Sequence, residues 1–446
     1  MDFRQLKDQA HSFRKQKQFE QALSIYERIF VEYPDEFGYW EQIGYCACLR
    51  HVGRADEALN ILRELYPKLR DANPPEERLF SWCRNEYGWC VYDTELKNLN
   101  WEGKVDENRL FKAAKAITQL TAQEEFSPYE RTVFRVVDYL QSKQNPNYGQ
   151  ILYWLDKLDP NLLTAIPTPA TSVDARNPTY PSPREDWYAH RSKAFLEVGR
   201  YAECVEICTQ ALTTLDTFHY DRNIWLRWYR AKSLIALNRP AEALADLQEV
   251  GKSKTDFFVD HEIARTHFLL NQFDDALSHA VSAALARGGL EFKWEVFLLI
   301  GEILEAKNDL DNARKHVCLA AKIRAEQGWS KMPLRLSQSI QRLQVNLNDA
   351  PDSKSLKREL LEYWKRIRPL PKTEYSGVVD RIHDNGDCGW VKNDDGRRHY
   401  FKIRHFNGSP KDLQSGLRVG FNLIEKMNKK KGVMELNAID IVAVKP

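Results

Sequence analysis

Pairs of small residues, spaced twelve apart, return three times between Asn223 and Ala325. The pairs are Ala231 and Ala243, Ala264 and Ala276, and Gly301 and Ala313. Their first members are separated by 33 and then 37 residues. A small side chain is needed wherever two helices cross closely, so each pair indicates a helical hairpin whose arms touch. Hairpins repeated at this spacing predict an all-α solenoid.

The pattern resembles the tetratricopeptide repeat, in which small residues fall at the middle of each helix. The apolar positions of the last copy fit that family; they are Phe297, Ile300, Leu304, Leu310, Val317 and Ala320. Further copies are predicted at 1–34, where Ala10 and Ala22 form the same pair, in the segment that follows, and from Glu185. The resemblance implies a groove, lined by the first helix of each pair, that binds a protein partner.

The domain organisation is predicted from where this pattern weakens and stops. The parts are N-terminal, partly degenerate repeats at 1–164, a proline-rich loop or linker at 165–184, regular repeats at 185–330, capping helices that end in a basic helix at 331–372, and a barrel domain at 373–446. Proline, threonine and serine make the linker unfit for a helix. In the degenerate region, helices are expected at 76–92, 107–123, 128–143 and 147–158. Its aromatic residues are expected in the core: Trp82, Trp89, Trp101, Tyr139 and Trp154.

Charge is distributed unevenly along the chain although the net charge is only +2. Residues 353–446 hold 20 Lys and Arg against 12 Asp and Glu, whereas the preceding 352 residues hold 45 against 51. A basic end is typical of proteins that meet nucleic acid, although a solvated surface explains it as well. Neither a signal peptide nor a membrane-spanning segment is expected. Eight cysteines without a CxxC pair indicate buried, reduced thiols, no metal site and a cytoplasmic protein.

The segment 355–368 predicts an amphipathic helix with one apolar and one basic face. Leu356, Leu360 and Trp364 share the apolar face, while Lys357 and Arg358 belong to the basic one. Such a helix suits either a cap that closes the repeat array or a basic arm beside a nucleic-acid site, and both roles are compatible.

From Tyr375 the apolar period changes to two, which predicts five short strands separated by Gly- and Asn-rich turns. The third strand is expected at 399–406, and a basic turn, 429–431, is expected before the last strand. Gly377-Val378-Val379, Gly389-Trp390-Val391 and Tyr400-Phe401 follow one another as in the first three strands of the cold-shock domain. The resemblance covers 375–442 and implies an all-β oligonucleotide-binding (OB) barrel. Where that family has a further stacking aromatic residue in its second strand, this chain has Cys388.

Strand alternation predicts which side chains of the barrel face outward. Val391, Phe401 and Ile403 are expected inside, since the opposite register would bury Lys402. The resulting nucleic-acid-binding residues, together with a first-strand arginine, are Arg381, Trp390, Lys392, Tyr400, Lys402 and Arg404. Exposed rings stack on bases while cations follow the phosphates, so this surface predicts RNA or single-stranded DNA as partner. The alternative is a barrel that serves only as a docking or capping module.

A peptide groove is predicted on the first helices of the regular copies. Its residues are Trp225, Trp228, Lys232, Phe258, His261, Arg265 and Phe268. Apolar anchors flanked by cations suit a peptide with acidic residues. Alternatively, these aromatic side chains pack against the loop at 165–184.

No catalytic motif, cofactor motif or metal-ligand pattern emerges from the sequence. The chain is therefore interpreted as a non-enzymatic adaptor that recruits a protein through its helical array and binds nucleic acid through its barrel. The second interpretation is a protein-only scaffold, for instance a subunit of a bacterial stress or anti-phage defence system. An enzyme would need an active site in the degenerate region, at 76–160.

Overall fold

The computed structural model describes residues 2–72, 76–99, 105–169, 179–329, 331–367, 373–383, 386–408, 412–428 and 433–444. The chain divides into two compact units, Met1–Thr255 and Asp256–Pro446, and each is described by itself. Of the features predicted from sequence, residues 170–178 of the linker, Trp101 and the basic turn 429–431 lie outside the described residues.

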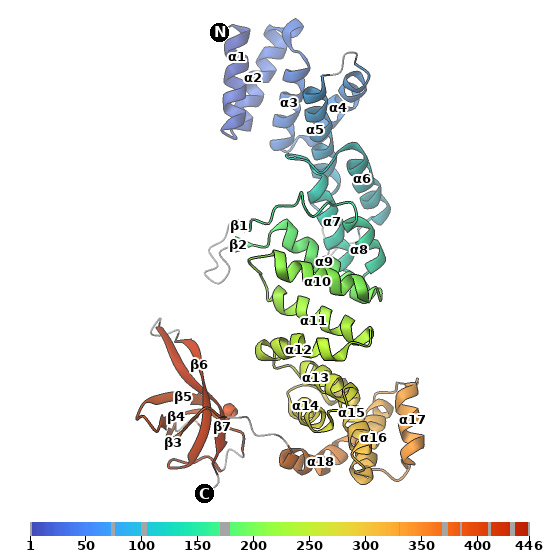
Figure 1. Cartoon of the computed structure of the whole chain (residues 1–446). Coiled ribbons are helices and arrows are strands. Elements are labelled where there is room, and N and C mark those ends of the chain that lie inside the picture. The colour runs from blue at the N-terminus through green and yellow to red at the C-terminus, as the bar shows by residue number, and fades with distance from the viewer. Residues whose placement is uncertain are drawn as a thin grey trace. The chain divides into compact units, whose positions relative to one another are not determined.

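The described residues of the first unit form twelve α-helices and one very short pair of strands (Figure 1). Its helices are α1 (Phe3–Lys15), α2 (Phe19–Glu32), α3 (Tyr39–His51), α4 (Ala55–Arg70), α5 (Glu77–Glu95), α6 (Glu107–Leu120), α7 (Tyr129–Gln141), α8 (Tyr148–Leu155), α9 (Pro183–Glu197), α10 (Tyr201–Thr214), α11 (Arg222–Ala236) and α12 (Pro240–Ser253). The short 3₁₀ helix η1 (Pro34–Glu36) follows α2. Strands β1 (Thr168–Pro169) and β2 (Thr179–Tyr180) pair antiparallel between α8 and α9.

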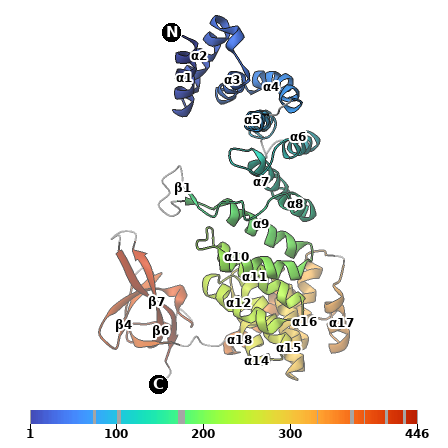
Figure 2. The ribbon, with the colours of Figure 1, turned by 45° about the horizontal axis from the view of Figure 1, so that its top comes forward.

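In the part of the second unit that the structure describes there are six further α-helices and, from Tyr375, five strands (Figure 2). The helices are α13 (Phe257–Leu269), α14 (Phe273–Leu285), α15 (Trp294–Ala306), α16 (Leu310–Glu326), α17 (Leu334–Leu343) and α18 (Ser353–Ile367), with the 3₁₀ helix η2 (Leu290–Lys293) before α15. Among the helices that the structure describes, none has the length and apolar character needed to cross a bilayer.

The paired small residues lie where the helices of each hairpin meet. Ala231, Ala243, Ala264, Ala276 and Ala313 are fully buried. A Cβ at Gly301 would lie 2.6 Å from Val317 Cγ2 in the same hairpin. One at Gly44 on α3 would lie 2.4 Å from the hydroxyl of Tyr26 on α2, in the preceding hairpin. Larger side chains would push the arms apart, so the prediction of helical hairpins is confirmed at these positions.

A left-handed residue closes six of the hairpin turns, a regularity that the small-residue pattern does not reveal. These residues have φ between 59° and 85° and are Lys17, Gly53, Gly199, Asn238, Asn271 and Asn308. Asn and Gly dominate because they tolerate this conformation at a helix C-terminus. The three asparagines share the 33- and 37-residue steps of the small residues.

Helix α18 buries its apolar face against α16. Trp364 is fully buried, stacks on Phe297 at 5.4 Å between ring centroids, and donates from Nε1 to His316 Nε2 at 2.8 Å. His316 Nδ1 lies 2.7 Å from the carbonyl oxygen of Asn312, so the imidazole is neutral with its proton on Nδ1. Burial lowers the pKa of His316 to about 4.

Strands β3 (Tyr375–Ile382), β4 (Cys388–Asn393), β5 (Arg398–Lys402), β6 (Arg418–Asn428) and β7 (Val433–Ala443) form a closed barrel in the order β3-β4-β5-β7-β6. Strand β3 pairs antiparallel with both β4 and β6, while β5 meets β7 in parallel. Val379, Val391, Phe401, Val419 and Phe421 fill its core. The prediction of a helical array followed by a small five-stranded barrel is confirmed.

Candidate functional site: a barrel row and a helical cavity

Three neighbouring strands of the barrel bring predicted binding residues into one row. Arg381 on β3 pairs in register with Trp390 on β4, which pairs in register with Tyr400 on β5. The Trp390 and Tyr400 rings lie 5.7 Å apart between centroids at an interplanar angle of 74°. We call Arg381, Trp390 and Tyr400 the aromatic row.

A β-bulge between Val379 and Arg381 decides which side chain stands beside Trp390. Regular pairing after Val379↔Val391 would place Asp380 opposite Trp390, whereas the bulge places Arg381 there. Gly389 permits this close approach, because a Cβ at that position would lie 2.6 Å from the carbonyl oxygen of Arg381. The bulge therefore sets a cation next to the indole.

Cations flank the aromatic row on both sides. Lys392 pairs in register with Arg398 on one side, and Lys402 pairs with Cys388 on the other. Among the described residues, Arg381, Lys392, Lys402 and Arg404 have no carboxylate within ion-pair distance. Arg398 is a further cation here that was not predicted, because the third strand was expected to begin one residue later, at His399. The Arg398 guanidinium lies 3.1 Å from Asp380 Oδ2.

Arg404 occupies a different element from the one predicted. The third strand was expected to run to Phe406, but β5 ends at Lys402, and Arg404 lies in the 3₁₀ helix η3 (Ile403–His405). This turn carries Phe406 into the barrel core, where it bridges to Ile441. Ile403, expected inside, is only partly buried there.

Both rings of the aromatic row already have polar partners. Trp390 Nε1 donates to His383 Nε2 at 3.2 Å. A hydrogen bond with Cys388 and partial burial raise the pKa of Tyr400. Cys388 itself is half-buried, whereas the other seven cysteines are buried free thiols. The rings are thus held in place rather than free to rotate.

The predicted groove residues are all half-buried and lie on α11 and α13, which belong to different units. On α11, Lys232 Nζ lies 5.6 Å from the ring centroid of Trp228. Lys254 Nζ lies 5.7 Å from the ring centroid of Trp225. On α13, Arg265 pairs with Glu262 at 2.9 Å, and Phe268 contacts Phe273. Phe258 and His261 lie on the same helix. A single groove made by all seven residues stays a prediction.

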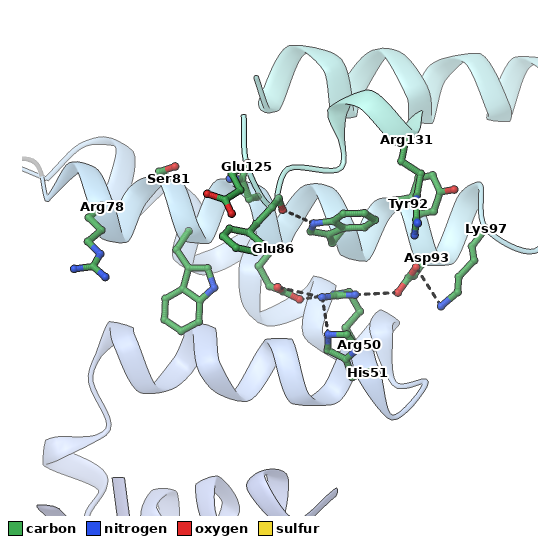
Figure 3. Close-up of a pocket in the computed structure, with 14 residues that line it drawn as sticks. Arg50, His51, Arg78, Ser81, Glu86, Tyr92, Asp93, Lys97, Glu125 and Arg131 are labelled. Atoms are coloured by element: carbon green, nitrogen blue, oxygen red, sulfur yellow. Dashed lines mark hydrogen bonds and ion pairs between the residues drawn. The ribbon is translucent and has the colours of Figure 1, made fainter. Parts of the chain in front are cut away.

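A cavity of about 700 Å³ opens between α3, α5 and α7 in the first unit (Figure 3). We call it the inner cavity. Trp82 and Trp89 line it instead of lying wholly in the core as expected, while Tyr139 and Trp154 are buried as predicted. Both indoles pack against the hydrophobic core and also line the cavity, and an arginine of α3 lines the cavity with them.

That arginine, Arg50, is held by two carboxylates of α5. Its Nε lies 2.5 Å from Glu86 Oε1, and its Nη1 lies 3.4 Å from Asp93 Oδ2. The guanidinium also lies 5.6 Å from the Trp89 ring, which Arg131 approaches to 5.8 Å. Burial, and then the charge of Arg50, lowers the pKa of neighbouring His51 to about 4, so this imidazole is neutral at pH 7.

The segment between α6 and α7 forms the rim of the inner cavity. A Cβ at Gly88 would lie 2.8 Å from Pro128 and Thr121, so glycine lets this segment approach α5 closely. Trp89 Nε1 then donates to the carbonyl oxygen of Phe126 at 2.7 Å. Phe126 has φ of +63° and leaves its ring 81% exposed at the rim. A left-handed phenylalanine with an exposed ring is a strained feature of the kind found at binding sites.

The sequence held a signal for the inner cavity that small-residue periodicity does not use. Trp82, Glu86, Trp89 and Asp93 follow one another at spacings of three and four, which places them on one face of α5. Acidic residues alternating with tryptophans on one face are unsuited to a core. Among the described residues, no group of three or more His, Cys, Asp or Glu side chains is placed to hold a metal ion.

Comparison with known families matches two stretches of the chain. Residues 9–36 match the tetratricopeptide repeat. The helical part is a tetratricopeptide-like repeat array. Residues 224–360 match a family described as a domain of unknown function (DUF7017), which runs from α11 into α18 and ends before the barrel. No curated protein matches the chain.

Solved structures of repeat proteins align with most of the chain at low identity. The TPR2AB domain of yeast Sti1 in complex with pHSP90 is 12% identical, covers 76% of this chain and 97% of its own, and has a TM-score of 0.26. Yeast Tom70 is 13% identical, with coverages of 81% and 91% and a TM-score of 0.28. RapI in its apo form is 11% identical, with coverages of 80% and 85% and a TM-score of 0.31. Scores this low carry no inference about function.

Proposed function

We propose that this protein is a non-enzymatic, cytoplasmic adaptor that binds a protein segment through its helical array and single-stranded nucleic acid through its barrel. The observation that carries the nucleic-acid half is the aromatic row, flanked by Lys392, Lys402 and Arg404. Proteins hold single strands without reading their sequence by stacking bases on adjacent aromatic rings and by contacting the phosphates with cations. RNA and single-stranded DNA share this chemistry.

The closed five-stranded barrel supports the proposal that this domain is a cold-shock-like OB fold. In such folds the second and third strands carry the oligonucleotide, and here Trp390 and Tyr400 lie on the equivalent strands β4 and β5. Cys388 replaces one stacking ring, which predicts weaker binding than three rings would give, by roughly 1–3 kcal/mol for one base.

For the protein partner, the inner cavity supports an extended segment better than a compact ligand. The face of α5 between Arg78 and Asp93 is about 22 Å long at 1.5 Å per residue, which matches about seven residues of extended chain. Arg78 and Arg131 lie toward opposite ends of the cavity (Figure 3) and have no ion-pair partner among the described residues. A segment with acidic ends and an apolar centre fits this arrangement. The residues of α11 and α13 are proposed as further contacts.

The decisive experiment measures anisotropy of a labelled oligothymidine, about 12 nucleotides long, with the full chain at several salt concentrations. We expect binding at low salt that weakens as salt rises, since cations release counterions from the strand. Trp390→Ala should weaken it, whereas Trp82→Ala, which removes an indole from the inner cavity, should not. No binding at low salt would contradict the nucleic-acid half.

The second candidate is a protein-only scaffold whose barrel no longer binds nucleic acid. It is favoured by the polar partners that Trp390 and Tyr400 already have, His383 and Cys388. If it is correct, Trp390→Ala lowers the melting temperature and leaves nucleic-acid binding as it was.

A further inference from the structure

A second, smaller cavity of about 440 Å³ lies between α6 and α8 and has a different chemistry from the inner cavity. Its lining residues are Asn108, Phe111, Lys112, Lys115, Gln150, Tyr153 and Trp154. We call it the α6–α8 cavity. It shares no residue with the inner cavity, which is built on α3, α5 and α7.

The described lining of the α6–α8 cavity is basic and includes no acidic side chain. Lys112 and Lys115 are exposed, three residues apart on one face of α6, and have no carboxylate within ion-pair distance in the described part of the chain. The nearby carboxylates are taken by other cations: Glu107 lies 2.7 Å from Lys143 Nζ and Asp156 lies 2.5 Å from Arg191 Nη1. Cβ atoms three residues apart on a helix lie about 5–6 Å from each other. The ammonium groups of Lys112 and Lys115 can therefore both reach one phosphate group placed between them.

Flat apolar surface adjoins these lysines. The half-buried Phe111 lines the cavity and stacks on the buried Trp154 with an interplanar angle of 19°. Tyr153 is 51% exposed, and Lys157 Nζ lies 4.8 Å from its ring centroid. The amides of Asn108 and Gln150 each offer a donor and an acceptor, as the edge of a nucleobase requires. Carboxylates would be needed for a cationic ligand, and none is found among the described residues that line the cavity.

We propose that the α6–α8 cavity binds a nucleobase together with its phosphate. The base stacks on Tyr153, the amides of Asn108 and Gln150 meet its edge, and the phosphate lies between Lys112 and Lys115. Two sources offer this chemistry: a free nucleotide, or one residue of a single strand. The site is independent of the barrel, so it does not depend on the proposed function.

The test uses the full chain carrying Trp390→Ala, so that the barrel contributes little, and two probes: fluorescent N-methylanthraniloyl-ADP and labelled oligothymidine. Tyr153→Leu should weaken binding roughly tenfold to a hundredfold by removing the stacking ring. Lys112→Gln/Lys115→Gln should also weaken it and make it less sensitive to salt. Lys68→Gln/Lys252→Gln removes the same charge from α4 and α12 and should change nothing.

The two probes distinguish the sources, and four results would overturn the proposal. Effects of Tyr153→Leu on the nucleotide indicate a free ligand, whereas effects on the oligothymidine alone indicate a strand. The proposal fails if neither probe responds to Tyr153→Leu, if the control weakens binding equally, or if a hexaglutamate peptide competes as well as ADP. Loss of all binding with Trp390→Ala alone would leave the barrel proposal standing and end this one. Binding that Tyr153→Leu abolishes and Trp390→Ala leaves unchanged would support the α6–α8 cavity and contradict the barrel proposal.

Discussion

The inner cavity and the aromatic row of the barrel both combine tryptophan with arginine, but their cations differ in pairing and in burial. In the inner cavity, Arg50 is nearly buried and neutralised by Glu86 and Asp93. On the barrel, Arg381, Lys392 and Lys402 face solvent without a carboxylate partner among the described residues. A paired, buried cation holds helices together, whereas an unpaired, exposed one is available to a polyanion.

The same contrast extends to histidine and tryptophan. His316 and Trp364 satisfy one another's polar atoms inside the helical array. On the barrel, Trp390 is only half-buried and keeps ring surface open beside its hydrogen bond to His383. Residue type alone therefore does not separate a structural site from a binding site in this chain; pairing and burial do.

The largest expected effect breaks the buried ion pair of the inner cavity. Arg50→Ala leaves Glu86, whose side chain is 6% exposed, without its partner, and should lower the free energy of unfolding by roughly 3–5 kcal/mol. Arg54→Ala is the control, because its pair with Glu57 is exposed and screened by solvent and should contribute little to stability. Urea unfolding followed by circular dichroism measures both; equal effects would contradict the contrast.

Removing the barrel tryptophan should affect binding far more than stability. Trp390→Ala should weaken oligothymidine binding by roughly 1–3 kcal/mol, or about tenfold to a hundredfold, with the salt dependence nearly unchanged. Anisotropy titrations measure the affinity, and a melting curve measures stability. A large fall in melting temperature with unchanged affinity would mean that Trp390 is as structural as Trp364.

Acid should destabilise the helical array through His316. Its pKa in the folded protein is about 4 against an ordinary value of 6.5, so the unfolded chain binds more protons between these values. Stability is therefore complete above pH 6.5 and is lost as the pH falls toward 4, by about 2 kcal/mol at pH 5. Melting curves at pH 7 and pH 5 test this. His316→Gln should show a smaller difference between the two, and an unchanged difference would count against it.

The smallest expected effect concerns one exposed cation of the barrel. Lys392→Gln should weaken binding of every single strand alike and reduce the slope of log affinity against log salt by about 0.7. Its melting temperature should match that of the unsubstituted protein. Lys365→Gln is the control, since Lys365 is paired with Glu362 on α18. If only the control changed the slope, the phosphate contacts would lie on α18 and not on the barrel.

Local pattern was enough to predict the fold class. Small residues twelve apart predict hairpins because two helices can cross closely only where Cβ atoms leave room, and Ala231 and Ala243 are indeed fully buried. Strand alternation likewise predicts Val391 and Phe401 inside the barrel. The helices of the degenerate region were also predicted to within a few residues, since apolar periodicity survives there after the small residues are lost.

Tertiary structure alone decided where the candidate sites lie. The bulge after Val379 exchanges Asp380 for Arg381 beside Trp390, and alternation cannot reveal a one-residue insertion whose cause is pairing with another strand. Gly88 admits the segment that carries Phe126 to the rim of the inner cavity, and Arg50 reaches across from α3 to α5. The sequence by itself determined which elements form, because their periodicity is local. It did not determine the sites, because these depend on side chains that meet only after distant helices and strands have packed.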